Sequence, residues 1–387
     1  MPRALIRVLP FVVPLILFGF PWAVLVGFGV HWPTPVTVTG TVLFLAALVG
    51  LPALMVLGHR RRRDPGGPPG AGRDRAARVG DFLLGAGWVL FTWSLLGQLL
   101  RLALAVAGVA DPTRSRLVAL AVLVVTAALL GYGLVEALRL PRVKTVRVVL
   151  PRLGADLDGL RVVLITDTHF GPIDRTRWSA RMARRINELA ADVVCHTGDL
   201  ADGSVAERAG QVGPLAGVRA TLGRFYVSGN HEYFGVAQDW LDRMAELGWR
   251  PLHNQAETLH RGRHRLLVAG VDDATAAGYG LPGHGADLAT ALIGADPEVP
   301  VLLLAHQPSQ VSASVEAGVD LQLSGHTHGG QIWPFHYLVR LDQPVLAGLS
   351  RHGARTQLYT SRGSGFWGPP LRVFAPSEIT LLVLHSE

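Results

Sequence analysis

Four long segments without a charged residue lie within the first 135 residues, and they constrain the fold of this chain more than any other feature. Residues 8–30 and 36–58 each give 23 uncharged positions, and residues 82–100 and 117–135 each give 19. About 20 apolar residues in a helix cross the hydrocarbon core of a bilayer. Buried helices of a soluble domain are the alternative for the two shorter segments, but four such segments in succession favour membrane spans.

Charge is distributed unevenly along the chain. Residues 1–150 hold 16 Lys and Arg against 5 Asp and Glu, whereas residues 151–387 hold 20 against 24. Seven arginines lie between residues 60 and 78, and residues 31–35 have no Lys or Arg. Because basic loops stay on the cytoplasmic side, we expect a multi-pass protein of the cell membrane with its second part in the cytoplasm. The acidic balance of that part argues against a nucleic-acid partner.

From about residue 147, short apolar runs alternate with stretches of helical spacing, which predicts an α/β domain. The only cysteine, Cys195, lies in one such run, so we expect a buried thiol and no internal disulfide. Polar clusters end most of these runs, at the carboxyl edge where sheets of this kind bind ligands. The clusters are Asp167-Thr168-His169, Gly198-Asp199, Gly229-Asn230-His231-Glu232, His306, and Gly325-His326-Thr327-His328.

Taken singly, these clusters differ in specificity, from Gly-Asp as the weakest signal through Gly-Asn-His-Glu to Gly-His-Thr-His as the strongest. Asp-x-His is common by chance, and a lone histidine such as His306 is more often a buried core residue than a ligand. In this order, however, the clusters resemble the signature of calcineurin-like metallophosphoesterases, from about Leu160 to the C-terminus. The resemblance implies a four-layer αββα sandwich, with two mixed sheets facing each other and helices outside.

The resulting expected organisation has three parts. Residues 1–140 would form a membrane domain with helices at about 8–30, 36–58, 82–104 and 117–138. Residues 141–158 would form a linker, and residues 159–387 the metallophosphoesterase domain.

The resemblance also implies a site for two divalent metal ions, which could be Mn, Fe, Zn or Co. Asp199 would bridge the two ions. Asp167, His169 and His328 would complete the shell of the first, and Asn230, His306 and His326 that of the second. A metal-bridging hydroxide would attack phosphorus.

Three further residues are candidates for roles around the metals. His231, adjacent to Asn230, would stabilise the transition state or protonate the leaving oxygen. Glu232 would orient His231, or would be an ordinary acidic residue at a helix start. Arg362, in a glycine-rich segment, would clamp a phosphate or lie in a plain turn.

Two further stretches narrow the resemblance. Residues 325–334 read GHTHGGQIWP and residues 359–384 read YTSRGSGFWGPPLRVFAPSEITLLVL. With the apolar segments, they resemble the transmembrane proteins with a metallophosphoesterase domain, a branch similar to enzymes that hydrolyse UDP-2,3-diacylglucosamine. We therefore expect a membrane-anchored hydrolase of a phosphodiester or pyrophosphate bond, with a lipid-linked substrate as one candidate. The alternatives are a phosphomonoesterase and a non-catalytic membrane sensor or scaffold.

Overall fold

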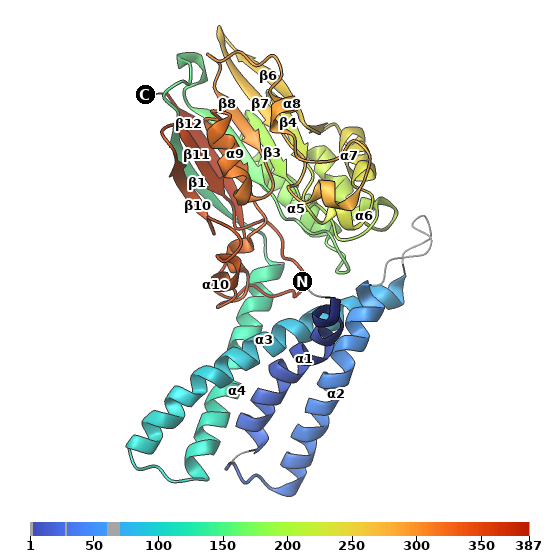
Figure 1. Ribbon diagram of the computed structural model, residues 1–387, viewed down its shortest axis with the longest axis vertical. Helices are drawn as coiled ribbons and strands as arrows, with labels where there is room; N and C mark the ends of the chain where they lie inside the picture. The colour runs from blue at the N-terminus through green and yellow to red at the C-terminus, as the bar shows by residue number, and fades with distance from the viewer. Residues whose placement is uncertain (1–2, 28, 60–69, 387) are drawn as a thin grey trace.

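The computed structural model describes residues 3–27, 29–59 and 70–386. Its first part is a bundle of apolar helices, drawn in blue to green in Figure 1. They are α1 (Arg3–Trp22), continued by the π-helical turn η1 (Ala23–Gly27), α2 (Thr34–His59), α3 (Ala71–Val106) and α4 (Thr113–Leu138). Of the described helices, α2, α3 and α4 are long and apolar enough to cross a membrane, and Val12–Gly27 is a shorter apolar stretch. The predicted arginine cluster at 60–63 lies outside the described residues.

Helix α3 begins at Ala71, well before the apolar segment that the sequence analysis starts at residue 82. Its first turns hold Arg73, Asp74 and Arg78, and these charged side chains face the second part of the molecule rather than lipid. The helix therefore extends out of its apolar segment and reaches the second part of the molecule.

The second part is a sandwich of two six-stranded mixed sheets. The first sheet has the order β1 (Arg142–Val149), β12 (Glu378–His385), β2 (Leu160–Ile165), β3 (Val193–Thr197), β4 (Gly223–Val227) and β5 (Arg250–Pro251). The second has the order β10 (Gly348–His352), β11 (Thr356–Thr360), β9 (Leu321–Ser324), β8 (Val301–Leu304), β7 (His264–Gly270) and β6 (Gln255–Arg261). Strands β2, β3 and β4 run parallel, as do β7, β8, β9 and β11.

Apolar side chains from both sheets meet in one core, in which Leu164 and Cys195 of the first sheet pack with Leu304 and Leu323 of the second. Helices α5 (Thr176–Asn187), α6 (Val205–Val212) and α7 (Ala237–Glu246) cover the outer face of the first sheet. Helices α8 (Leu288–Ala291) and α9 (Val311–Glu316) lie over the second. These layers confirm the expected αββα sandwich.

The remaining elements are single turns: η2 (Ala155–Leu157), η3 (Gly213–Gly217), η4 (Glu232–Phe234), η5 (Ala276–Tyr279), η6 (Pro308–Gln310), η7 (His328–Gly330) and α10 (His336–Val339).

The segment expected to be a linker, residues 141–158, contains strand β1. This strand pairs in parallel with β12 over its whole length, from Arg142 opposite Glu378 to Val149 opposite His385. Only residues 139–141 separate it from α4. The membrane helix therefore runs almost directly into the edge of the first sheet.

Loops of the sandwich also pack on the membrane helices. Ile332, Leu371 and Val373 share a buried cluster with Val89 of α3. The charged start of α3 meets α6, where the guanidinium of Arg208 donates two hydrogen bonds of 2.8 Å to the carboxylate of Asp74. These contacts fix the sandwich against α3 and α4, below it in Figure 1.

Candidate metal centre

The polar clusters predicted from the sequence lie together at the carboxyl ends of β2, β3, β4, β8 and β9. The backbone there is unusual, because five non-glycine residues have positive φ angles between 42° and 69°. They are Asp167, His169, Asp199, His326 and His328. Such conformations cost about 1–3 kcal/mol each and persist where surrounding contacts enforce them, often at functional sites. Here the carboxylate of Asp167 accepts the backbone N–H of His326 at 2.9 Å.

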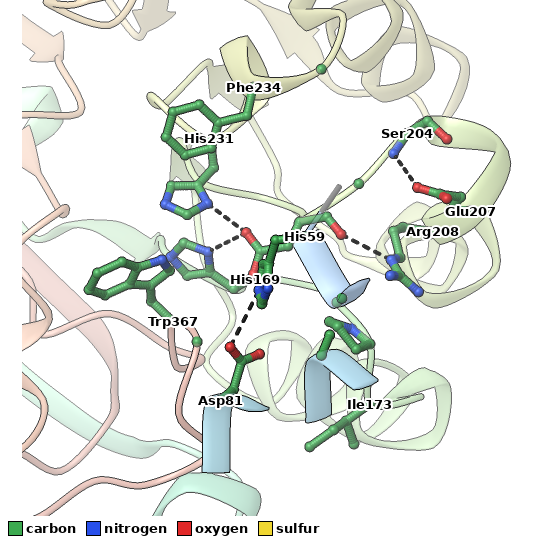
Figure 2. Close-up of a pocket in the computed structure, with 18 of the residues that line it drawn as sticks. His59, Asp81, His169, Ile173, Ser204, Glu207, Arg208, His231, Phe234 and Trp367 are labelled. Atoms are coloured by element: carbon green, nitrogen blue, oxygen red, sulfur yellow. Dashed lines mark hydrogen bonds and ion pairs between the residues drawn. The ribbon is translucent and has the colours of Figure 1, made fainter. Parts of the chain in front are cut away.

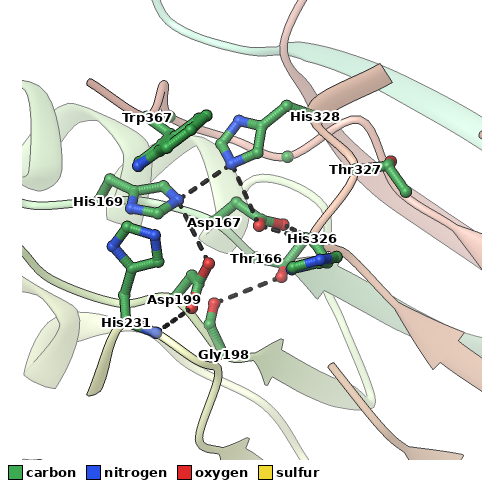
Figure 3. A network of polar contacts seen from close by, with 12 residues as sticks. Thr166, Asp167, His169, Gly198, Asp199, His231, His326, Thr327, His328 and Trp367 are labelled. Carbon is green, nitrogen blue, oxygen red and sulfur yellow. Dashed lines mark hydrogen bonds and ion pairs between the residues drawn. The ribbon is translucent and has the colours of Figure 1, made fainter. Parts of the chain in front are cut away.

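All seven predicted ligand residues converge into two adjoining groups, most of which Figure 3 draws. In the first group, His328 Nε2 lies 3.0 Å from His169 Nε2 and 3.3 Å from Asp167 Oδ1. In the second, His306 Nε2 lies 3.2 Å from Asn230 Oδ1 and 3.3 Å from His326 Nδ1.

Asp199 lies between the two groups. Its Oδ2 is 3.6 Å from His169 Nε2 and 3.2 Å from His306 Nε2. One carboxylate thus reaches both groups.

The donor set fits cations. His306 Nδ1 lies 2.7 Å from the carbonyl oxygen of Thr197 and therefore donates its proton there. In the neutral ring, this leaves the Nε2 lone pair facing Asp199 Oδ2 and Asn230 Oδ1, both of which are acceptors. His169 repeats the pattern, with Nδ1 against Asp202 and Nε2 toward His328 and Asp199. A bound metal ion would stabilise lone pairs that converge in a buried space. The hydrogen-bond partner at Nδ1 of each ring fixes the tautomer that leaves Nε2 for the metal.

Charge around His306 supports this interpretation. Burial lowers the pKa of His306, but Asp199 and Asp167 outweigh it and raise the pKa well above its usual value. Burial raises the pKa of Asp199, but His306 and His231 outweigh this effect and hold the pKa well below its usual value. The carboxylates thus favour positive charge at this position, which a bound metal ion would supply.

His231 lies beside the two groups with its imidazole fixed by Asp202. The Oδ1 atom of Asp202 is 2.6 Å from His231 Nδ1 and 3.0 Å from His169 Nδ1. Burial lowers the pKa of His231, but Asp199 and Asp202 raise it to about 9. Asp202 was not predicted from the sequence, where its only signal is its place three residues after Asp199.

Glu232 is buried and does not hold the ring of His231. Its carboxylate accepts the backbone N–H groups of Asp199 at 3.0 Å, Leu200 at 2.8 Å and Gly229 at 2.6 Å. It therefore ties the loop after β3 to the loop after β4. Burial and the neighbouring Asp199 raise its pKa to about 8.

A cavity of about 760 Å³ opens beside His231 (Figure 2). His169 and Asp202 line it on the side of the candidate metal centre, together with the aromatic rings of Phe234 and Trp367. The opposite wall comes from the membrane helices: Gly58 and His59 of α2, and Arg73, Ala77, Arg78 and Asp81 of α3. Arg362 does not line this cavity; it lines a separate one of about 250 Å³.

Comparisons with known proteins agree with this geometry. The model of the calcineurin-like phosphoesterase family matches residues 160–330. The chain is 37% identical over 270 residues to a transmembrane protein with metallophosphoesterase domain from Danio rerio, and 38% identical over 278 residues to the protein of that name from Bos taurus. These matches cover 68% and 69% of the chain and 62% of each relative, so the chain spans less than two thirds of their length.

A bacterial relative matches along more of its length. An uncharacterised metallophosphoesterase of Campylobacter jejuni is 36% identical over 305 residues, which cover 78% of the chain and 79% of that protein. The fold and the two adjoining groups of candidate ligands are those of the metallophosphoesterases, a family that depends on a dinuclear metal centre. The chain belongs to the calcineurin-like metallophosphoesterase family, and its homologues include transmembrane members of that family.

Proposed function

We propose that this protein is a membrane-anchored phosphoesterase that cleaves a phosphodiester or pyrophosphate bond in a lipid-linked substrate of the UDP-diacylglucosamine kind. The observation that supports it best is the 760 Å³ cavity, which joins the candidate metal centre to the ends of two membrane helices. Its size falls in the range of about 300–1,000 Å³ that small-molecule sites occupy. A headgroup held there would keep its acyl chains close to the bilayer.

The proposed metal ligands are the seven residues that converge at the strand ends. Asp167, His169 and His328 would hold one ion, Asn230, His306 and His326 the other, and Asp199 both. The residue types suit Mn, Fe, Zn or Co. Bound ions would polarise the phosphoryl group and make a coordinated water more acidic.

The chain's own groups would complete the reaction. The carboxylate of Asp202 accepts a hydrogen bond from the Nδ1–H of His231. The other ring nitrogen, Nε2, is then available to the substrate. From Nε2, His231 would pass a proton to the leaving oxygen. Glu232 would keep the loops that carry Asp199 and Asn230 at a fixed separation through its three backbone contacts.

The cavity also supports the expected topology. The arginines of α3 line it at the end of the membrane region, as basic residues do on the cytoplasmic side. We therefore propose that the active site faces the cytoplasm at the cell membrane.

A substrate panel tests this function on the full chain in lipid nanodiscs supplied with Mn²⁺. We expect hydrolysis of bis-para-nitrophenyl phosphate and of a UDP-linked diacyl lipid, with slower hydrolysis of para-nitrophenyl phosphate, and loss of all activity in Asp199→Asn. Preference for the monoester would favour a phosphomonoesterase instead. A protein that binds two metal ions yet hydrolyses none of these esters with any divalent metal would be the sensor or scaffold.

A further inference from the structure

A second cavity lies on the membrane side of the sandwich and is separate from the candidate active site. Its volume is about 250 Å³, and none of its lining residues lines the larger cavity. Trp333, His336, Arg362 and Phe374 line it with small and apolar neighbours, and no carboxylate does. A cationic side chain in a space without acidic groups favours an anionic ligand.

Arg362 is fixed by its backbone while its guanidinium is unpaired. Its N–H donates to Glu378 Oε1 at 3.3 Å, and its carbonyl oxygen accepts from Arg372 Nη2 at 2.9 Å. Within the part of the chain that the structure describes, its guanidinium makes no hydrogen bond or ion pair. A guanidinium whose N–H groups are free and whose backbone is fixed can donate paired hydrogen bonds to a phosphate group.

Aromatic contacts place this cavity next to the membrane helices. The ring of Trp333 lies 6.2 Å from that of Trp93 in α3, and the ring of Phe374 lies 6.3 Å from that of Tyr132 in α4. The cavity therefore lies beside α3 and α4.

Large apolar side chains are exposed beside the cavity. Tyr337 and Leu338 of α10 are 61% and 48% exposed, and Leu341 and Phe374 are 84% and 58% exposed. Figure 1 shows α10 at the end of the sandwich nearest α3 and α4. Soluble surfaces seldom leave such side chains clustered in water, whereas the interfacial region of a bilayer accommodates them.

From these observations we propose that the smaller cavity binds the phosphate of an anionic membrane lipid, with Arg362 as its ligand. The side chains of Tyr337, Leu338, Leu341 and Phe374 enter the interfacial layer around the bound lipid. Gly329 also lines the cavity, directly after His328. The bound headgroup therefore touches the turn that carries a candidate metal ligand.

Lipid binding by the full chain tests the proposal without measuring catalysis. The chain in detergent is titrated with phosphatidylglycerol or phosphatidylcholine, and bound lipid is counted by native mass spectrometry. We expect a preference for phosphatidylglycerol, and a loss of about five- to tenfold in its affinity in Arg362→Gln, the order of effect of one arginine at a membrane surface. Arg362→Lys should retain part of the preference.

The matched control is Arg340→Gln, which removes an exposed positive charge near α10 but outside the cavity. An equal loss in both glutamine variants would mean a general electrostatic effect and would overturn the proposal. Displacement of the lipid by millimolar inorganic phosphate would indicate a soluble-phosphate site and would overturn it too. The thermal unfolding temperature of Arg362→Gln in phosphatidylcholine nanodiscs should equal that of the parent chain. A loss of lipid binding would then not be explained by a loss of folding.

Discussion

At the scale of single residues, Asp202 links the candidate catalytic histidine to the candidate metal centre. Its Oδ1 atom contacts the Nδ1 atoms of both His231 and His169. Burial raises the pKa of Asp202, but His169 and His231 outweigh that effect and hold the pKa below its usual value. An ionised carboxylate between the two rings keeps a proton on each Nδ1, which leaves Nε2 of His169 for the candidate metal centre and Nε2 of His231 for the substrate.

Replacing Asp202 by Asn removes this charge with little change of shape. Partners of metal-binding histidines of this kind typically contribute 10- to 100-fold to metal affinity or activity, so we expect a loss of about that size in Asp202→Asn. Manganese titration and kcat on bis-para-nitrophenyl phosphate measure the two effects separately. Asp239→Asn is the matched control, because Asp239 lines the same cavity without contacting either histidine. A kcat and a manganese affinity in Asp202→Asn equal to those of the control would contradict the role given to Asp202.

The sequence predicted the site residues that belong to short motifs and missed those that act through space. The clusters ending β2, β3, β4, β8 and β9 supplied all seven candidate ligands that converge, because each lies at a strand end. Glu232 was singled out, but its contacts with the backbone of Asp199 and Leu200 depend on two loops meeting in the fold. No spacing in the chain specifies that meeting.

At the scale of elements, strand β1 lies within residues 141–158, which were predicted to be a linker, and it shows why that prediction was made. Its residues Arg142–Val149 mix charged and β-branched side chains, and its partner β12 lies at the opposite end of the chain. Local pattern cannot supply such a partner. The αββα layers were expected from the family resemblance, whereas the edge strand that attaches them to α4 was visible only in the structure.

The start of α3 connects the membrane region to the candidate active site through α6. Arg208 donates from Nη1 and Nη2 to Asp74 and from Nε to the carbonyl oxygen of Asp202, each bond between 2.8 and 3.0 Å. Asp74 and Arg208 are 16% and 5% exposed at the side chain, so solvent screens the pair weakly.

We expect Asp74 and Arg208 to be coupled by about 1–3 kcal/mol, as charged hydrogen-bonded neighbours are. The cycle of Asp74→Asn, Arg208→Gln and the double variant gives this value from urea denaturation of the full chain in mild detergent. Arg185 of α5 and Glu188 directly after it form an exposed pair that provides the comparison and should show about 0–1 kcal/mol. A coupling no larger than that of the surface pair would mean that α3 and α6 merely lie side by side.

At the scale of the whole molecule, several contacts among the described residues hold the sandwich to the membrane region. Strand β1 follows α4, α6 pairs with α3, and the loops around Ile332 and Leu371 pack on α3. The contact of α6 with α3 lies at the wall of the larger cavity, and Ile332 lies close to the turn that carries His328. The membrane helices thus form part of the proposed active site, rather than serving only as an anchor.

The side of the membrane can be tested because Cys195 is the only cysteine and is fully buried. Burial raises the pKa of its thiol, so it should resist maleimide. Ala317→Cys adds an exposed thiol after α9, and Ala110→Cys adds one between α3 and α4. The arginine distribution predicts that a membrane-impermeant maleimide labels the Ala110→Cys chain in intact cells, and the Ala317→Cys chain only after the membrane is permeabilised. The reverse pattern would place the sandwich outside the cytoplasm, where a lipid substrate would have to come from the opposite leaflet.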